Sequence, residues 1–405
     1  MKKETLNTDI IVVGCGIVGL AVVRELRARY PRLALTAIDK EGSLACHASG
    51  RNSGVVHAGF YYSPESLKAR LTAEGNRLLT EYCLKRSLSI LRCGKVVVAK
   101  DESEVALLDE LKRRGEANNV ELEVIDEKRL AAIEPNARTH RAALYSPSTS
   151  TINPREVVES IAAELTEGCR LLLNERFVRR IDAGCIETTS RMIRFKHLIN
   201  SAGLYADKVA HQFGVGGEYT LLPFKGLYLG YKDDGLVRTH VYPVPDLKNP
   251  FLGVHLTKTA DGHVKVGPTA IPAFWREQYK GLANFNVSEF VEVLSSEARL
   301  FAVDSFNFRR LAFDELRKYY GHRMQDEAAA LVKKLDPGKF SGFLSPGIRA
   351  QLIDRRTSKL VMDFVVEYAE NSTHILNAVS PAFTCAFSFA NFVVDEMQNR
   401  CIIGA

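Results

Sequence analysis

The sequence predicts an α/β fold in which a domain with a mostly parallel sheet is interleaved with an α+β domain built on an antiparallel sheet. Three observations predict it: a glycine-rich turn between a buried strand and a helix near the N-terminus, strand and helix patterns that return at the C-terminus, and alternating apolar and polar residues between them. The chain has 405 residues, which is long for one ordinary domain. We therefore expect two lobes, or one domain that carries a second region.

The first strand and turn carry a dinucleotide-binding pattern. Asp9 to Val13 predicts a short buried parallel strand, which runs directly into Gly14-Cys15-Gly16-Ile17-Val18-Gly19 and a helical pattern. Gly14 suits the tight turn, Gly16 lets the backbone approach a pyrophosphate, and Gly19 allows close packing of helix on strand. Free N–H groups at the helix start attract the phosphate charge. This order of elements predicts a Rossmann-like domain.

The second strand ends in an acid. Leu33 to Ile38 is apolar and leads to Asp39, about 20 positions after Gly19, where a carboxylate can accept hydrogen bonds from the adenosine ribose. An acid there is unfavourable for a 2′-phosphate. The motif by itself does not separate FAD from NAD.

Residues 42–62 form a long segment rich in Gly, Ser and Ala, as expected where backbone closely approaches a ligand. Ser63 and Pro64 follow it and predict the start of a helix, with Pro64 in the first position.

Later segments return to the same domain. Ser201-Ala202-Gly203 forms a small-residue turn between a strand and a helical stretch, and residues 373–380 and 386–398 read as a buried strand and a helix. Residues 90–100 and 219–270 alternate as antiparallel strands do, and 284–335 are mostly helical in pattern. The expected domains are therefore 1–85, 145–218 and 340–405 for the dinucleotide, and 86–144 and 219–339 for a substrate.

Composition limits the classes of function. Hydrophobic residues make up 46% of the chain and charged residues 25%, so disorder is not expected. The formal charge of +6 comes from 54 Lys and Arg against 48 Asp and Glu, scattered along the chain. This favours an anionic cofactor, an anionic substrate or a membrane surface, and no nucleic-acid partner is expected.

The eight cysteines form no C-x-x-C pair and have no matching histidine spacing. Neither a zinc site nor an iron-sulfur cluster is expected, and no metal ligand is assigned. We expect reduced, mostly buried thiols. The N-terminus shows no secretion signal, and no apolar run approaches the roughly 18 residues of a spanning helix. The expected location is cytoplasmic, with peripheral attachment to the inner face of a membrane as the alternative.

Five segments together resemble one family. They are HASGRNSGVVHAGFYYSPESLKARL at 47–71, FKGLYL at 224–229, residues 241–270 (VYPVPD to KVGPTA), GIRAQLID at 347–354 and SPAFT at 380–384. In this order they resemble the L-2-hydroxyglutarate dehydrogenases and oxidases, flavoproteins of the D-amino-acid-oxidase-like fold. Phe383 departs from the family, which generally has a small residue there, and Asp39 stands where Glu is commoner.

The resemblance implies FAD as the cofactor and oxidation of L-2-hydroxyglutarate to 2-oxoglutarate, by hydride transfer to flavin N5. It implies a set of cofactor-binding residues: Gly14, Gly16, Ile17, Val18, Gly19, Asp39, Lys40, His47, Ser49, Asn52, Ser53, Gly54, Val55, Ser201, Ala202, Gly203, Gly347, Ile348, Ser380, Pro381, Ala382, Phe383 and Thr384.

The chemistry requires a base for the hydroxyl proton and cations or donors for two carboxylates. His57 and His255 lie in the family-like segments and are the candidate bases, between which the sequence does not choose, and Arg349 is the third predicted catalytic residue. The expected substrate contacts are Tyr61, Tyr62, Lys225 and Tyr242.

The electron acceptor is left open among oxygen, a quinone and an electron-transfer protein, because a second glycine motif for NAD(P)H is missing from the sequence. The alternative activity is a related flavin oxidase for an amino acid, a secondary amine or glycerol 3-phosphate. A flavin-holding regulatory protein without chemistry is the alternative outside enzymes.

Overall fold

The computed structural model describes residues 3–245 and 251–403. The chain divides into two compact units, one of residues 1–51, 154–221 and 350–405 and the other of residues 52–153 and 222–349. We call them the first and the second unit. The first unit combines the two ends of the chain with a middle segment, and the second unit combines the two segments between them.

The first unit is built on a six-stranded sheet with the order β10-β3-β2-β14-β25-β24. The first five strands pair in parallel and β24 pairs with β25 in antiparallel fashion. Four apolar, fully buried residues make up β2, as the predicted strand requires. The bounds are Cys169–Leu172 for β10, Leu35–Ile38 for β3, Ile10–Val13 for β2, His197–Asn200 for β14, Ser372–Asn377 for β25 and Val365–Ala369 for β24.

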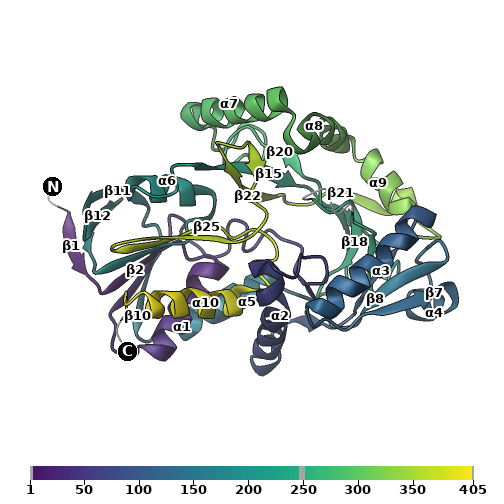
Figure 1. Ribbon diagram of the computed structural model, residues 1–405, viewed down its shortest axis with the longest axis horizontal. Helices are drawn as coiled ribbons and strands as arrows, with labels where there is room; N and C mark the ends of the chain where they lie inside the picture. The colour runs from purple at the N-terminus through teal and green to yellow at the C-terminus, as the bar shows by residue number, and fades with distance from the viewer. Residues whose placement is uncertain (1–2, 246–250, 404–405) are drawn as a thin grey trace. The chain divides into compact units, whose positions relative to one another are not determined.

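Helices and a second sheet cover the two faces of this sheet (Figure 1). On one face lie α1, α5 and α10, with α1 packed against the other two. On the other, a core joins β2 and β14 to α6 and to a four-stranded sheet of the order β1-β13-β12-β11. The bounds are Ile17–Arg29 for α1, Pro154–Glu164 for α5, Ala386–Asn399 for α10, Gly203–Tyr205 for η1, Ala206–Gln212 for α6, Glu4–Asn7 for β1, Arg191–Arg194 for β13, Cys185–Thr188 for β12 and Phe177–Asp182 for β11.

The second unit is built on an eight-stranded sheet with the order β21-β16-β19-β18-β17-β6-β8-β7. Its pairs are antiparallel with one exception, because β17 runs parallel to β6. The sequence predicts antiparallel strands at residues 90–100 and 219–270, and this prediction is wrong for the pair of β6 and β17. The bounds are Phe340–Phe343 for β21, Leu229–Tyr231 for β16, Val264–Gly267 for β19, His255–Lys258 for β18, His240–Pro243 for β17, Lys95–Val98 for β6, Ala142–Ser146 for β8 and Glu123–Asp126 for β7.

There are two further small sheets: the one with the order β4-β9-β5 belongs to the second unit, and in the one with the order β20-β15-β22-β23 strand β20 belongs to the second unit and β23 to the first. The chain passes between units inside β15 and inside β22. The strand bounds are Val55–Val56 for β4, Ser150–Ile152 for β9, Ile90–Leu91 for β5, Ile271–Pro272 for β20, Tyr219–Gly226 for β15, Gly347–Asp354 for β22 and Lys359–Leu360 for β23. The helix bounds are Leu67–Lys85 for α2, Glu102–Ala117 for α3, Glu127–Ile133 for α4, Val287–Val303 for α7, Ser305–Asn307 for η2, Phe308–Leu316 for α8, Arg317–Tyr320 for η3, His322–Ala329 for α9 and Pro337–Lys339 for η4.

One face of the eight-stranded sheet is covered by α9. Alternate residues of β6, β17, β18 and β19 point to this face, among them Val96, Val241 and Leu256, and pack under α9 with Met324. Because side chains alternate along a strand, the residues between them point to the opposite face. That opposite face carries Val97 and Leu144, which pack with Leu108 of α3, and the polar side chains described below.

The start of α2 differs from the prediction. The helix begins at Leu67, and its N-cap is Ser66, whose hydroxyl accepts a hydrogen bond from the Ala69 N–H at 3.1 Å. Ser63 instead closes a turn, because its carbonyl accepts from both the N–H and the hydroxyl of Ser66. A side-chain acceptor at Ser66 thus fixes the first turn, and Pro64 lies outside the helix.

The helices expected at 284–335 and 386–398 are confirmed as α7, α8, α9 and α10. The structure pairs none of the eight cysteines, and five of them are buried, as the prediction of mostly buried thiols requires. No helix of the described residues combines the length and the apolar character that a membrane crossing needs.

Candidate active site

The glycine turn of the first unit is shaped by close backbone packing. Gly14 has a φ of +107°, and a Cβ atom on it would lie 2.4 Å from the Ser201 carbonyl oxygen. A Cβ atom on Gly19 would lie 2.0 Å from the Gly14 carbonyl oxygen. Side chains are therefore excluded at both positions, and the turn of Ser201 packs directly on the turn of Gly14. This is the cradle that a dinucleotide pyrophosphate needs.

Gly16 and Ser49 meet at the start of α1. The N–H of Ile17 donates to the Ser49 hydroxyl at 2.9 Å. Gly16 is the N-cap of α1, and no side chain caps the helix from within the turn. The helix N-terminus therefore keeps N–H groups of the first turn that can bind a phosphate.

Asp39 follows β3 and holds the same turn in place by hydrogen bonds. Its carboxylate accepts from the N–H of Cys15 at 2.8 Å and from the N–H of Glu41 at 2.9 Å. These two bonds leave further lone pairs on the carboxylate for ribose hydroxyls. The cradle of Gly14, Gly19 and Asp39 thus fits the adenosine and pyrophosphate portion of FAD.

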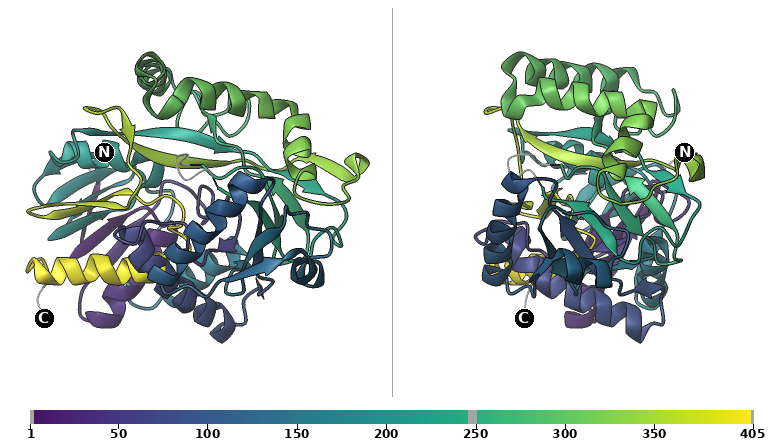
Figure 2. Two further views of the ribbon diagram at one scale, coloured as in Figure 1. Left: turned by 45° about the vertical axis from the view of Figure 1, so that its right-hand side comes forward. Right: turned by 90° about the vertical axis from the view of Figure 1, so that its right-hand side faces the viewer.

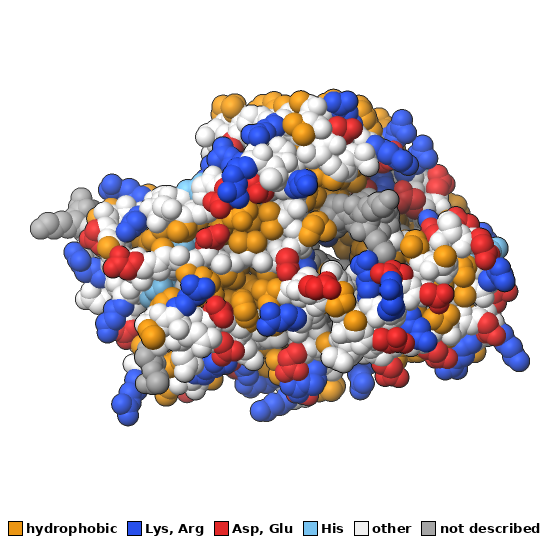
Figure 3. Space-filling model, viewed as in Figure 1, with side chains coloured by type: hydrophobic (Ala, Val, Ile, Leu, Met, Phe, Trp, Pro, Cys, Tyr) orange, Lys and Arg blue, Asp and Glu red, His pale blue; other side chains and the backbone are white. Residues whose placement is uncertain are grey.

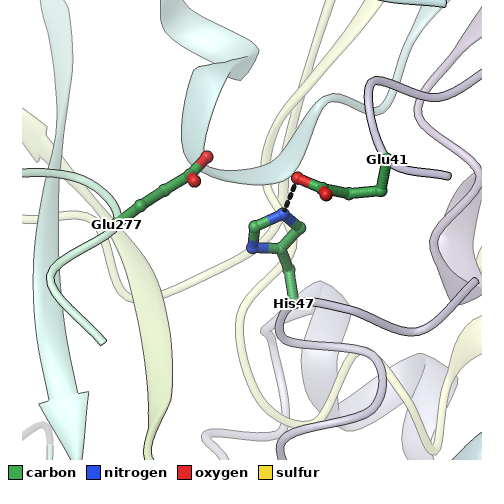
Figure 4. Close-up of side chains that lie close together, drawn as sticks. All are labelled: Glu41, His47 and Glu277. Atoms are coloured by element: carbon green, nitrogen blue, oxygen red, sulfur yellow. Dashed lines mark hydrogen bonds and ion pairs between the residues drawn. The ribbon is translucent and has the colours of Figure 1, made fainter. Parts of the chain in front are cut away.

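Lys40, Glu41 and His47 form a charged cluster beside this turn. Nε2 of His47 lies 2.8 Å from Oε1 of Glu41 (Figure 4). Nζ of Lys40 forms an ion pair with the same carboxylate. Burial raises the pKa of Glu41, but hydrogen bonds from Lys40 and His47 outweigh it and lower the pKa to about 2. Glu41 is therefore ionised at neutral pH. Sequence reasoning named Lys40 and His47 but missed Glu41.

The structure places the other predicted cofactor residues in both units. Ser201, Ala202 and Gly203 and the 380–384 segment belong to the first unit, and residues 52–55 with Gly347 and Ile348 belong to the second. Within the second unit, Asn52, Ser53 and Gly54 form a tight turn, because the Gly54 N–H donates to Asn52 Oδ1 at 2.8 Å.

All predicted catalytic and substrate residues belong to the second unit. On the polar face of the eight-stranded sheet, the imidazole of His255 stacks on the ring of Tyr242, with centroids 3.7 Å apart and an interplanar angle of 19°. Both side chains are almost completely buried. Strand pairing explains the contact, because Val241 pairs with Leu256 and so places Tyr242 opposite His255.

Backbone contacts fix the tautomer of His255. Its Nδ1 lies 2.9 Å from the Gly253 carbonyl oxygen, which can only accept, so Nδ1 carries the proton and Nε2 keeps its lone pair. Burial lowers the pKa of His255 to about 3, with Lys95 and Lys265 lowering it further and the bond to Gly253 opposing them. The free protein therefore holds a neutral imidazole with one basic nitrogen.

Lys95 is the residue that sequence reasoning missed. Its side chain is fully buried, and its Nζ has no hydrogen-bond partner among the described residues. The ammonium lies over the rings of Phe60, Tyr61 and Tyr242, at 4.5, 4.6 and 5.0 Å from their centroids. Burial lowers the pKa of Lys95 to about 7. The signal in the sequence was one lysine in the otherwise apolar strand KVVV.

The parallel pairing of β17 with β6 places Lys95 opposite His240. Burial, followed by the Lys95 charge, lowers the pKa of His240 to about 3. Its Nδ1 accepts from the Lys258 N–H at 3.2 Å, so its Nε2–H faces Cys93 Sγ at 3.4 Å. His240 is thus held by neighbours on both ring nitrogens, unlike His255.

The pKa values of His57 and Arg349 are lowered as well. Burial is the largest cause of the lowered pKa of His57, and the positive charges of Lys95 and Arg349 add to it. Burial also lowers the pKa of Arg349, whose guanidinium lies 5.0 Å from the Phe251 ring centroid. The second unit therefore gathers basic groups that a bound anion would stabilise.

Three of the residues predicted to contact the substrate are Tyr61, Lys225 and Tyr62. The hydroxyl of Tyr61 is buried and has no hydrogen-bond partner among the described residues. Lys225 is 5% exposed, and its Nζ donates to the Tyr319 hydroxyl at 3.4 Å. Tyr62 lies under the Lys68 ammonium, at 5.9 Å. Within the family-like segment 241–270, residues 246–250 lie outside the described residues.

The arrangement of a dinucleotide cradle in one unit and a buried basic and aromatic face in the other is that of a flavin-linked oxidoreductase. The model of the family "FAD dependent oxidoreductase" matches residues 9–395. The chain belongs to this family.

Two relatives span almost the whole chain. L-2-hydroxyglutarate dehydrogenase, mitochondrial, of Homo sapiens is 34% identical, over 98% of this chain and 90% of the relative. L-2-hydroxyglutarate dehydrogenase of Escherichia coli is 32% identical, over 96% of this chain and 93% of the relative.

Solved structures share the fold. L-alpha-glycerophosphate oxidase from Mycoplasma pneumoniae with FAD bound has a TM-score of 0.75 at 22% identity, over 96% of this chain and 94% of the other. Glycine oxidase from Geobacillus kaustophilus has a TM-score of 0.70 at 15% identity, over the same shares. The predicted fold class and the FAD cofactor are confirmed.

Proposed function

We propose that this protein oxidises L-2-hydroxyglutarate to 2-oxoglutarate. The observation that carries the proposal is the buried polar face of the second unit, where a base with a fixed tautomer lies among cations. The relatives at 32% and 34% identity, which bear the name of this activity, support the choice of substrate. Bound FAD supplies the acceptor for the C2 hydrogen, which leaves as a hydride.

His255 takes the hydroxyl proton in this proposal. Its Nε2 carries the lone pair, because Nδ1–H is bound to the Gly253 carbonyl. The pKa of about 3 in the free protein is too low for an effective base. A bound dianion raises the pKa, because its negative charge stabilises the imidazolium. Substrate binding therefore activates the base.

Arg349 and Lys225 hold the two carboxylates in this proposal. Both lie in the family-like segments, and both have a pKa that burial lowers. Burying a cation without a counter-ion costs desolvation free energy, and the ion pair with an incoming carboxylate offsets that loss. The hydroxyls of Tyr61 and Tyr242 can complete the hydrogen bonds of the substrate. Tyr62 remains a proposed contact.

The electron acceptor stays open among oxygen, a quinone and an electron-transfer protein, and reoxidation rates distinguish them. The substrate-reduced protein would be mixed in turn with air and with a soluble quinone, and the reoxidation rates would be compared. Fast reoxidation by air assigns the role to oxygen, fast reoxidation by the quinone assigns it to a quinone, and slow reoxidation by both indicates an electron-transfer protein.

An anaerobic titration tests the substrate. L-2-hydroxyglutarate should bleach the flavin band near ~450 nm, and the D enantiomer should not. Glycerol 3-phosphate, L-glutamate and sarcosine serve as controls for the alternative activities. Bleaching by one of these controls, with L-2-hydroxyglutarate inactive, would overturn the substrate while leaving the family intact.

A further inference from the structure

Lys95 lies in a row of polar side chains that crosses the eight-stranded sheet. It pairs with Ser146 of β8 on one side and with His240 of β17 on the other. The register of β17 with β18 places Thr257 opposite His240, and Thr257 pairs with Lys265 of β19. Side chains of paired residues point to the same face of a sheet. The row therefore consists of two amines, one imidazole and two hydroxyls, without a carboxylate.

The end of the Lys95 side chain is shielded from solvent. The helix α3 packs on this face of the sheet with Leu108 and Leu111, and Figure 2 shows it in blue against the strands. The same core contains Phe60 and Tyr242, two of the rings that surround the Lys95 ammonium. Figure 3 shows Lys and Arg side chains spread over the molecular surface, where water solvates their charge. Lys95 is 0% exposed and has no such contact with water.

The rings around the Lys95 ammonium compensate its charge only in part. Nζ lies 4.5 Å from the ring centroid of Phe60, 4.6 Å from that of Tyr61 and 5.0 Å from that of Tyr242. Contacts between a cation and aromatic rings are weaker than the hydration that a buried ammonium loses. Burial lowers the pKa of Lys95 to about 7, and no carboxylate among the described residues opposes this shift. The ammonium thus lacks a counter-ion in the part of the chain that the structure describes.

Hydroxyl groups on the same face also have unused hydrogen-bonding capacity. The hydroxyls of Tyr61, Tyr242 and Thr257 are buried and have no hydrogen-bond partner among the described residues. Two of these three residues are the tyrosines whose rings contact the Lys95 ammonium. A hydroxyl can donate its proton to an anion, as an ammonium can. Several donors are therefore present around Lys95.

The titratable side chains around Lys95 are basic as well. Burial is the largest cause that lowers the pKa of His57, His240 and His255, and the positive charge of Lys95 adds to it. The other amine and guanidinium charges that act on these imidazoles, from Lys265 and Arg349, are also positive. A negative charge placed among these groups is stabilised by all of them.

We propose that Lys95 and the hydroxyls of Tyr61 and Tyr242 form a binding site for one small monovalent anion, such as chloride, in the protein without substrate. The ammonium and the two hydroxyls donate hydrogen bonds to the anion. A neutral amine offers no charge to an anion, so binding takes up one proton wherever Lys95 is deprotonated beforehand. This inference goes beyond the proposed function, because it concerns the protein before any substrate binds.

Thermal unfolding of the FAD-loaded protein without substrate tests the proposal. At pH 7, sodium chloride should raise the melting temperature in a saturable way relative to sodium gluconate of the same ionic strength. Gluconate is too large for a site enclosed by three rings, whereas bromide should replace chloride. The apparent dissociation constant of chloride should rise about tenfold per pH unit between pH 8 and pH 9.5, because one proton binds with each anion.

Lys95→Met should abolish the difference between chloride and gluconate. Lys128→Met is the matched control, since Lys128 is an exposed lysine of the second unit, and it should respond as the unchanged protein does. Equal stabilisation by the two salts, or a chloride effect that persists in Lys95→Met, would overturn the proposal. So would a dissociation constant that does not change with pH in the unchanged protein, a measurement that decides the matter even if Lys95→Met does not fold. Substrate is absent throughout, so the result is independent of the proposed function.

Discussion

The imidazole of His255 stacks on the ring of Tyr242 at 3.7 Å, and the same Tyr242 ring contacts the Lys95 ammonium at 5.0 Å. One tyrosine therefore joins the proposed base to a buried cation. This arrangement keeps His255 neutral until an anion arrives.

Replacing His255 by Asn should slow flavin reduction by about 10²–10⁴-fold, because the hydroxyl proton loses its acceptor. Stopped-flow mixing with substrate under anaerobic conditions measures the rate, and absorbance measures the FAD content, which should not change. His263→Asn is the matched control, since His263 is exposed and pairs with Asp234. A normal rate in His255→Asn would transfer the role to His57.

Replacing Lys95 by Met should change how stability depends on pH. The pKa of Lys95 is about 7 in the folded protein and 10.5 in the unfolded chain, so the unfolded chain binds more protons between these values. The free energy of unfolding should therefore gain on the order of 4 kcal/mol from this group as pH rises from 7 to 10.5.

Urea unfolding at pH 7 and pH 9.5 measures this difference. The Met variant should lose the Lys95 contribution, so its stability should change less between the two pH values than that of the unchanged protein. Identical pH dependence of both proteins would show that Lys95 is not a buried, depressed ammonium.

Binding of a dicarboxylate that cannot be oxidised, such as glutarate, should take up a proton at pH 8. The dianion raises the pKa of Lys95 and of the nearby His57, His240 and His255. Calorimetry in two buffers of different ionisation enthalpy counts the protons. Lys95→Met should take up fewer, and an equal number in both proteins would contradict the electrostatic role of Lys95.

Replacing Arg349 by Met should raise the KM for L-2-hydroxyglutarate about 10–100-fold, because one carboxylate loses a charged partner. Steady-state kinetics at saturating electron acceptor measures the change. Arg113→Met, at an exposed position, is the control. Loss of FAD from the Arg349 variant, without a change in KM after reconstitution, would assign this arginine to the cofactor instead.

Gly14→Ala should reduce FAD content at least tenfold and lower the free energy of unfolding by about 3 kcal/mol. The reason is the clash of the added Cβ with the Ser201 carbonyl oxygen at 2.4 Å and the φ of +107°. Gly217→Ala is the control, since a Cβ there meets no atom within 4 Å. Absorbance and thermal unfolding report the two effects.

The sequence by itself determined the dinucleotide half of this protein. Gly14, Gly19 and Asp39 lie within one contiguous strand, turn, helix and strand, so their roles follow from neighbours along the chain. The apolar and polar alternation also predicted the strands of the second unit, and the helical periodicity predicted α7 to α10.

Only the tertiary structure decided which polar residues meet and which faces are exposed. Lys95 reads as an ordinary strand lysine until the parallel pairing of β6 with β17 places it opposite His240, far away in the chain. On α7, the tertiary structure likewise decides that Val293 and Leu300 are the buried apolar residues. Periodicity shows that a helix has two faces, but the partners that cover one of them come from distant segments, which local sequence does not specify.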